Sequence, residues 1–139
     1  MPVITTITAA LLLITQQLLV LGIGRYRRAQ KVGVGVGDDA NLERLVRRHG
    51  NFAENAAIFV VTLGCLELLV GTGMPVLLLA LAFVICRVLH LVAFSSLGGS
   101  HGQAGARGYL KIRMLGVLGT MVVGIITGIY AMVAALMTL

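Results

Sequence analysis

Long apolar runs alternate with short polar links along this chain. The runs cover residues 3–24, 52–71, 75–97 and 114–139. Each supplies about the 20 residues that a helix, rising 1.5 Å per residue, needs to cross roughly 30 Å of hydrocarbon. None shows the period-two alternation of membrane-spanning strands. The pattern predicts an all-α membrane protein, a four-transmembrane-helix bundle with helices at residues 3–24, 42–71, 75–97 and 109–138.

The composition supports a membrane protein. Hydrophobic residues make up 58% of the chain and charged residues 12%, against about 25% charged in ordinary soluble domains. The links are too short for a separate soluble domain, so residues 1–139 are expected to form one domain. The first apolar run has no basic residues before it and is longer than the core of a signal peptide, which favours a retained helix.

The two cysteines, Cys65 and Cys86, lie in different apolar runs and are interpreted as small buried hydrophobic residues. They have no CxxC spacing, and no metal is expected.

Basic residues gather in the first and third links and are missing from the second, residues 71–75. The positive-inside rule then makes the basic links cytoplasmic and puts both termini on the opposite side of the membrane. The net charge of +6 is therefore attributed to orientation and to contact with anionic membrane lipids, and no nucleic acid is expected. The glycine-rich link at residues 31–37 lacks the strand and the GK[ST] of a phosphate loop, while Asp38 and Asp39 favour capping of the second helix.

The start of the second helix carries an unusual number of polar side chains. A charged residue in the membrane centre costs roughly 2.5–3.5 kcal/mol, so a functional site is expected here. At about 100° per residue, one stripe spans about 80° and consists of Glu43, Arg47, Asn51 and Glu54. Arg44, Arg48 and Asn55 form a neighbouring strip, in which the arginines are interpreted as snorkelling to the interface. Glu54, about three turns inside, requires a cationic or hydrogen-bonding partner. His49 points to another side and is interpreted as a packing residue.

Helices three and four offer partners. Arg87 and His90 share a face that Phe94 continues, and an arginine at this depth marks a candidate site whose partner is Glu54 or a bound anion. A purely structural Arg87–Glu54 ion pair is the alternative. Helix four begins near Arg113 and then carries a stripe of small residues suited to close helix packing, namely Gly116, Thr120, Gly124 and Thr127, with Gly124 and Gly128 as a small-xxx-small pair.

These motifs resemble the membrane-associated proteins in eicosanoid and glutathione metabolism, the MAPEG family, especially its bacterial members. The resemblance covers nearly the whole chain and rests on Glu43-Arg44-x-x-Arg47-x-His49-x-Asn51-x-x-Glu54, Arg87-x-x-His90 and Arg113-x-x-Gly116-x-x-x-Thr120.

The resemblance implies a homotrimer in a bacterial inner membrane that binds glutathione as co-substrate between adjacent subunits, near the cytoplasmic side. The glutathione-binding residues that it implies are Arg25, Arg47, Asn51, Glu54, Arg87, His90 and Phe94. Arginine forks suit the two carboxylates of glutathione. Arg113 is the predicted catalytic residue, which stabilises the thiolate, with Arg107 as a rival for that role. The activity implied is a glutathione transferase or peroxidase that acts on lipophilic small molecules.

Three positions depart from the family pattern. Phe94 stands where eicosanoid-synthesising members have a tyrosine, Asn55 where many relatives have tyrosine or threonine, and Gly50 where some enzymes have an arginine. Each removes or changes a polar contact. A second class of function therefore stays open, a non-catalytic scaffold, lipid-binding protein or accessory subunit of a membrane complex. A channel or transporter fits less well, because the polar residues are confined to one end of the helices.

Overall fold

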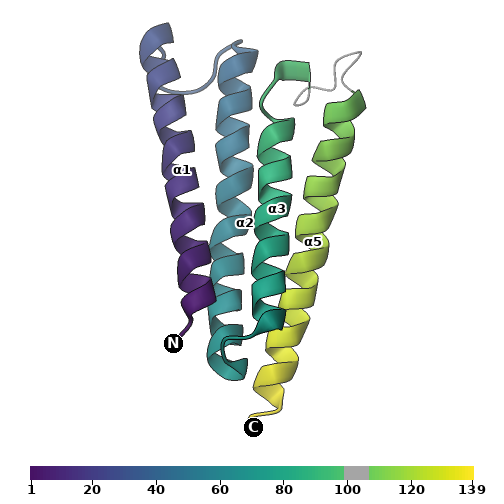
Figure 1. Cartoon of the computed structure of the whole chain (residues 1–139). Helices are drawn as coiled ribbons and strands as arrows, with labels where there is room; N and C mark the ends of the chain where they lie inside the picture. Colours follow the sequence, from purple (N-terminus) through teal and green to yellow (C-terminus); the bar gives the residue numbers. More distant parts are fainter. Residues whose placement is uncertain (99–106) are drawn as a thin grey trace.

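Four helices form the protein over the part of the chain that the structure, a computed structural model, describes, residues 1–98 and 107–139. They are α1 (Val3–Gln30), α2 (Ala40–Val70), α3 (Met74–Ala93) and α5 (Arg107–Leu136). All four are long and apolar enough to cross a membrane. Both termini and the α2–α3 turn lie at one end, and the α1–α2 link lies at the other (Figure 1). The predicted all-α, four-helix transmembrane fold is confirmed.

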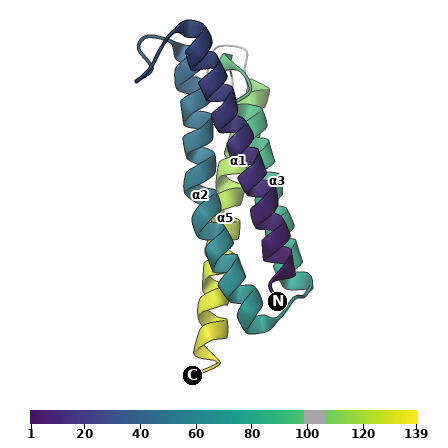
Figure 2. The same ribbon diagram turned by 90° about the vertical axis from the view of Figure 1, so that its left-hand side faces the viewer.

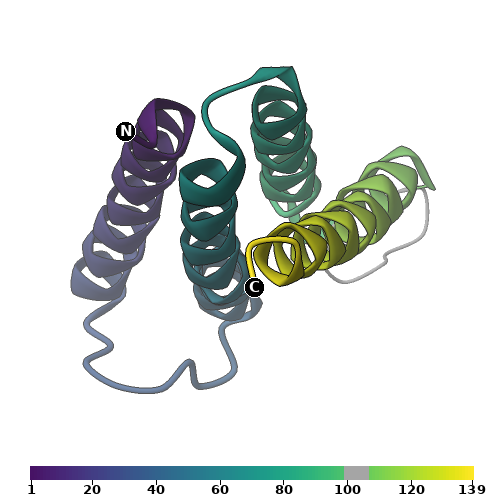
Figure 3. The same cartoon turned by 90° about the horizontal axis from the view of Figure 1, so that it is seen from below.

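The helices are arranged unevenly around α2. Seen along the bundle, α2 lies between α1 on one side and the α3–α5 pair on the other (Figure 3). Helix α5 packs mainly on α3 and also on α2, and its last turns reach beyond the start of α1 (Figure 2). This arrangement gives α2 one face toward α3 and α5 and another face away from them.

The helix ends differ from the predicted bounds where polar side chains bind the backbone. Helix α1 continues past residue 24 to Gln30, and Lys31 ends it in the left-handed conformation, with φ of 57°. Helix α2 begins at Ala40 because Asp39 caps it, as predicted, through Oδ1 contacts to the amides of Asn41 at 2.9 Å and Leu42 at 3.1 Å. These amide donors hold the pKa of the Asp39 carboxyl below its usual value.

An aromatic stack joins α2 to α3, and a glycine on α5 allows close contact with α3. The rings of Phe59 on α2 and Phe83 on α3 are stacked with centroids 3.7 Å apart. On α5, a Cβ added to Gly116 would lie 2.9 Å from the His90 nitrogen and 3.0 Å from the Cys86 carbonyl oxygen. Glycine thus lets the α3 and α5 backbones touch, which places His90 against α5.

A buried carboxylate that was not predicted joins α2 to the first turn of α1, at the end of the bundle where both termini lie. Glu67 on α2 is 2% exposed. Its two oxygens accept hydrogen bonds from the amides of Ile4, at 3.0 Å, and Thr5, at 2.8 Å, and Oε1 also accepts from the Thr72 hydroxyl at 2.8 Å. The first turn of α1 has no side-chain cap of its own, so Glu67 supplies the anion that a helix N-terminus favours.

Candidate functional site

The two polar strips of α2 face different surroundings. Arg44 donates two hydrogen bonds from Nη1, to the carbonyl oxygens of Phe94 at 2.9 Å and Ser95 at 3.0 Å. Its strip, with Arg48 and Asn55, is therefore turned toward α3 and α5. The predicted stripe is turned partly away from the chain, since Glu54 is exposed. Arg44 does not snorkel: it binds the end of α3, which helps to end that helix at Ala93 before residue 97.

Arg87 is the charged centre of the site. It is 3% exposed, and it joins three helices. Its Nη1 donates to the Asn51 carbonyl oxygen on α2 at 3.1 Å, while Nη2 donates to the Thr120 hydroxyl on α5 at 2.5 Å and lies 3.5 Å from the Gly116 carbonyl oxygen. Among the described residues Arg87 has no carboxylate partner, and it makes no ion pair with Glu54. A buried cation held only by neutral acceptors favours the binding of an anion nearby.

His90, Phe94 and Arg113 form a stack at the end of α3. The His90 and Phe94 rings have centroids 4.8 Å apart, and the guanidinium carbon of Arg113 lies 4.9 Å from the Phe94 centroid. His90 is 4% exposed, and its Nδ1 is buried without a hydrogen-bond partner. Phe94 thus acts as an apolar platform for a cation, without the hydroxyl that a tyrosine would supply.

A polar cavity of about 280 Å³ opens beside Arg87. Its lining comes from α2, α3 and α5 and consists of Asn51, Asn55, Arg87, His90, Val117, Thr120 and Met121. The guanidinium of Arg87 and the ring of His90 are its titratable groups. None of the described residues that line it is acidic, so this cavity suits a ligand with negative charge.

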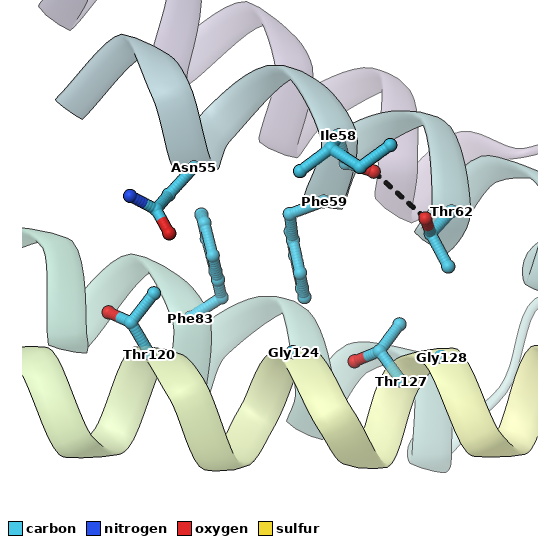
Figure 4. Close-up of a pocket in the computed structure, with 9 residues that line it drawn as sticks. All are labelled: Asn55, Ile58, Phe59, Thr62, Phe83, Thr120, Gly124, Thr127 and Gly128. Atoms are coloured by element: carbon cyan, nitrogen blue, oxygen red, sulfur yellow. Dashed lines mark hydrogen bonds between the residues drawn. The ribbon is translucent and has the colours of Figure 1, made fainter. Parts of the chain in front are cut away.

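A second cavity, of about 220 Å³, continues along the α2–α5 side of the bundle (Figure 4). It shares Asn55 and Thr120 with the polar cavity and otherwise extends over the Phe59–Phe83 stack toward Thr127 and Gly128. A Cβ at Gly124 or Gly128 would meet no atom within 4 Å. The predicted packing role of this glycine pair is therefore not seen within the chain, where the two glycines widen the groove instead.

The structure brings together some of the predicted site residues and separates others. Asn51, Arg87 and His90 line one cavity, and Phe94 and Arg113 adjoin His90 through the stack. The remaining predicted residues are exposed on the outside of the chain, namely Arg25, Arg47 and Glu54. Arg107, the alternative candidate for thiolate stabilisation, is exposed as well. Arg47 makes its ion pair with Glu43, at 2.9 Å.

Two contributors were not predicted as site residues. Thr120 had been assigned to helix packing, yet its hydroxyl accepts a hydrogen bond from Arg87 and donates one to the Gly116 carbonyl oxygen at 2.6 Å. Asn55 is predicted as part of the polar strip with Arg44 and Arg48 and as a departure from the family pattern, but not as a site residue. It lines both cavities, and its amide donates to the Asn51 carbonyl oxygen at 3.1 Å. Polar residues at spacings of four on one helix face were the available signal.

Comparison with known proteins identifies the family. The model of the MAPEG family matches residues 5–135. No curated protein matches the chain. The matched range includes all four helices almost entirely and every polar residue of the cavity. The chain therefore belongs to the MAPEG family and is an integral membrane protein.

Proposed function

We propose that this protein is a glutathione-dependent transferase or peroxidase that acts on lipophilic electrophiles inside the membrane. The observation that carries the proposal is the polar cavity around Arg87, which has a buried positive charge and no acidic lining residue. Glutathione carries two carboxylates and one ammonium, so a cationic cavity suits its net negative charge. The adjoining apolar cavity over Phe59 and Phe83 would hold the lipophilic reactant.

Arg113 is the proposed thiolate stabiliser. Lowering a thiol pKa from about 8.5 to about 6.5 requires roughly 2.7 kcal/mol of preferential stabilisation of the thiolate. The guanidinium of Arg113 lies over the Phe94 ring and is partly buried, and a guanidinium in such a position can supply that energy. The thiolate would form a carbon–sulfur bond at an electrophilic carbon, either expelling a leaving group or adding across an activated double bond that then takes up a proton. In the peroxidase reaction it would attack the hydroperoxide and break the O–O bond, which gives the alcohol and a glutathione sulfenic acid. A second glutathione would then form the disulfide and release water.

A homotrimer is part of the proposal, because one chain leaves polar side chains uncovered. Glu54 and Arg25 are exposed, and among the described residues Glu54 has no partner. A carboxylate facing lipid about three turns inside a membrane helix is costly. A second copy would cover these residues and bring Arg25, Arg47 and Glu54 to the cavity of its neighbour, with the basic links on the cytoplasmic side.

Glutathione binding and thiolate absorbance, measured on the protein in detergent, test the proposal. We expect the native chain to bind glutathione and to show thiolate absorbance at neutral pH. Arg113→Ala is expected to keep binding and to lose the thiolate signal, while Arg28→Ala, an exposed arginine of the α1 end, leaves both unchanged. If the native chain binds no glutathione, the proposed enzymatic function is refuted.

One observation favours a second candidate, a scaffold that retains binding without chemistry. Phe94 lies against His90 and Arg113 without a hydroxyl, so one hydrogen bond to a thiolate held by Arg113 would be missing. The same measurements separate the two candidates. Glutathione binding with no thiolate signal in the native chain supports the scaffold.

A further inference from the structure

Arg48 is a half-buried arginine without a partner. Its Nε is enclosed by protein and makes no hydrogen bond, and no ion pair joins its side chain to any residue within the described ranges. The charge that acts on it most closely is Arg44, one turn away and of the same sign. A snorkelling arginine would instead extend its head group into water, as the exposed Arg47 does.

Among the described residues, which include every acidic side chain, none supplies a counter-charge for Arg48. The carbonyl oxygens at the end of α3 are already bound by Arg44, at 2.9 and 3.0 Å. The chain has five acidic residues, and each is placed elsewhere. Asp38 and Asp39 lie in the α1–α2 link, Glu43 binds Arg47, Glu54 faces outward, and Glu67 caps α1 at the opposite end.

The helix phase turns Arg48 toward the cavities. At about 100° per residue, Arg48 lies about 40° from Arg44 and about 20° from Asn55 on the surface of α2. Arg44 contacts the end of α3, and Asn55 lines both the polar and the apolar cavity. Along the axis of α2, Arg48 therefore lies between these two residues, about one turn before Asn51, which lines the polar cavity.

We propose that Arg48 is a ligand-binding residue whose guanidinium takes an oxyanion, a carboxylate or a phosphate, at the mouth of the cavity between α2, α3 and α5. A planar guanidinium fork matches such groups with two parallel hydrogen bonds. The oxyanion comes either from glutathione, in which case the inference rests on the proposed function, or from the headgroup of an anionic lipid.

The first arm of the test compares glutathione with its glycine monoethyl ester, which lacks one carboxylate, by calorimetry in a neutral detergent. If Arg48 binds that carboxylate, the native chain prefers glutathione by about tenfold, since a charge-assisted hydrogen bond contributes about that factor or more. Arg48→Gln removes the preference, and Arg48→Lys, which keeps the charge but not the fork, retains part of it. Arg28→Gln is the matched control and leaves the preference as in the native chain.

The second arm measures retention of phosphatidylglycerol against phosphatidylcholine by native mass spectrometry of the same variants. If the oxyanion is a lipid phosphate, the native chain and Arg28→Gln retain phosphatidylglycerol preferentially and Arg48→Gln does not. A native chain that binds no glutathione refutes the proposed function, and the lipid arm then decides the role of Arg48 alone. If Arg48→Gln behaves like the native chain in both arms, the proposal is overturned.

Discussion

The Glu67→Gln substitution is expected to loosen α1 from the rest of the bundle. In the native chain two carboxylate oxygens receive the amides of Ile4 and Thr5 and the Thr72 hydroxyl. Glutamine keeps one acceptor oxygen but places an NH₂ group, a donor, against one of these donors. With Glu67 only 2% exposed, water is poorly placed to replace the lost acceptor.

The magnitude follows from the hydrogen bonds that are lost. A hydrogen bond to a charged group contributes about 1.5–3 kcal/mol, and an unsatisfied buried donor costs about 1–3 kcal/mol. Glu67→Gln loses one such bond and the charge of the others, so we expect the free energy of unfolding to fall by about 2–4 kcal/mol. Thr72→Val removes the neutral hydroxyl donor and is expected to cost about 1 kcal/mol.

Unfolding by a denaturing detergent, followed by circular dichroism, measures the change, and hydrogen exchange at the amides of Ile4 and Thr5 locates it. Asp38→Asn, an exposed carboxylate in the α1–α2 link, is the matched control and should alter stability by less than about 0.5 kcal/mol. Should Glu67→Gln match this control, with unchanged exchange at the start of α1, the capping role would be refuted.

Two further perturbations test the parts of the fold that position the site. Gly116→Val is expected to separate α5 from α3, because a Cβ there would lie 2.9 Å from the His90 nitrogen. Thermal unfolding should show that the free energy of unfolding falls by about 2 kcal/mol or more, and an unchanged melting temperature would contradict the close approach. Because the pKa of Asp39 is lowered in the folded chain, chiefly by the amide of Leu42, its contribution is present above the unfolded pKa and is lost as pH falls through the folded one. Asp39→Asn should therefore flatten the acid limb of a stability-against-pH curve, and identical limbs would count against the capping contact.

The spans were predictable because lipid imposes a length and an apolar composition that few other folds require. The ends of the helices were less predictable than the spans, since a charged turn can continue a helix outside the hydrocarbon. Helix α1 continues to Gln30 through a basic segment, whereas Arg44 takes the carbonyl oxygens at the end of α3. The Asp39 cap was predicted because capping is a local interaction, encoded within a few residues.

The sequence of α2 alone did not predict which of its two polar strips is turned toward α3 and α5. Helical periodicity groups Glu43, Arg47 and Glu54 on one side and Arg44 and Arg48 on the other, but both sides are polar, so hydrophobicity does not tell which one is turned inward. Glu67 presents the opposite case. A lone acid within an apolar run is a clear signal of a buried contact, yet its partners are backbone amides of α1, which any sequence supplies.

The two polar strips of α2 have different requirements, and this difference bears on how the site works. In the strip turned toward α3 and α5, Arg44 donates hydrogen bonds to carbonyl oxygens of the same chain. Arg48, in the same strip, has a buried Nε without a hydrogen-bond partner. The outward strip ends in Glu54, exposed and without a partner among the described residues. In a single chain in lipid, these two strips would leave the positive charge of Arg48 and the negative charge of Glu54 uncompensated, about 120° apart around α2 and less than about two turns apart along it. In the proposed homotrimer, a ligand with two carboxylates and an ammonium that is seated between one copy and the next would compensate both charges, whereas a purely anionic lipid would compensate Arg48 and leave Glu54 to a neighbouring copy.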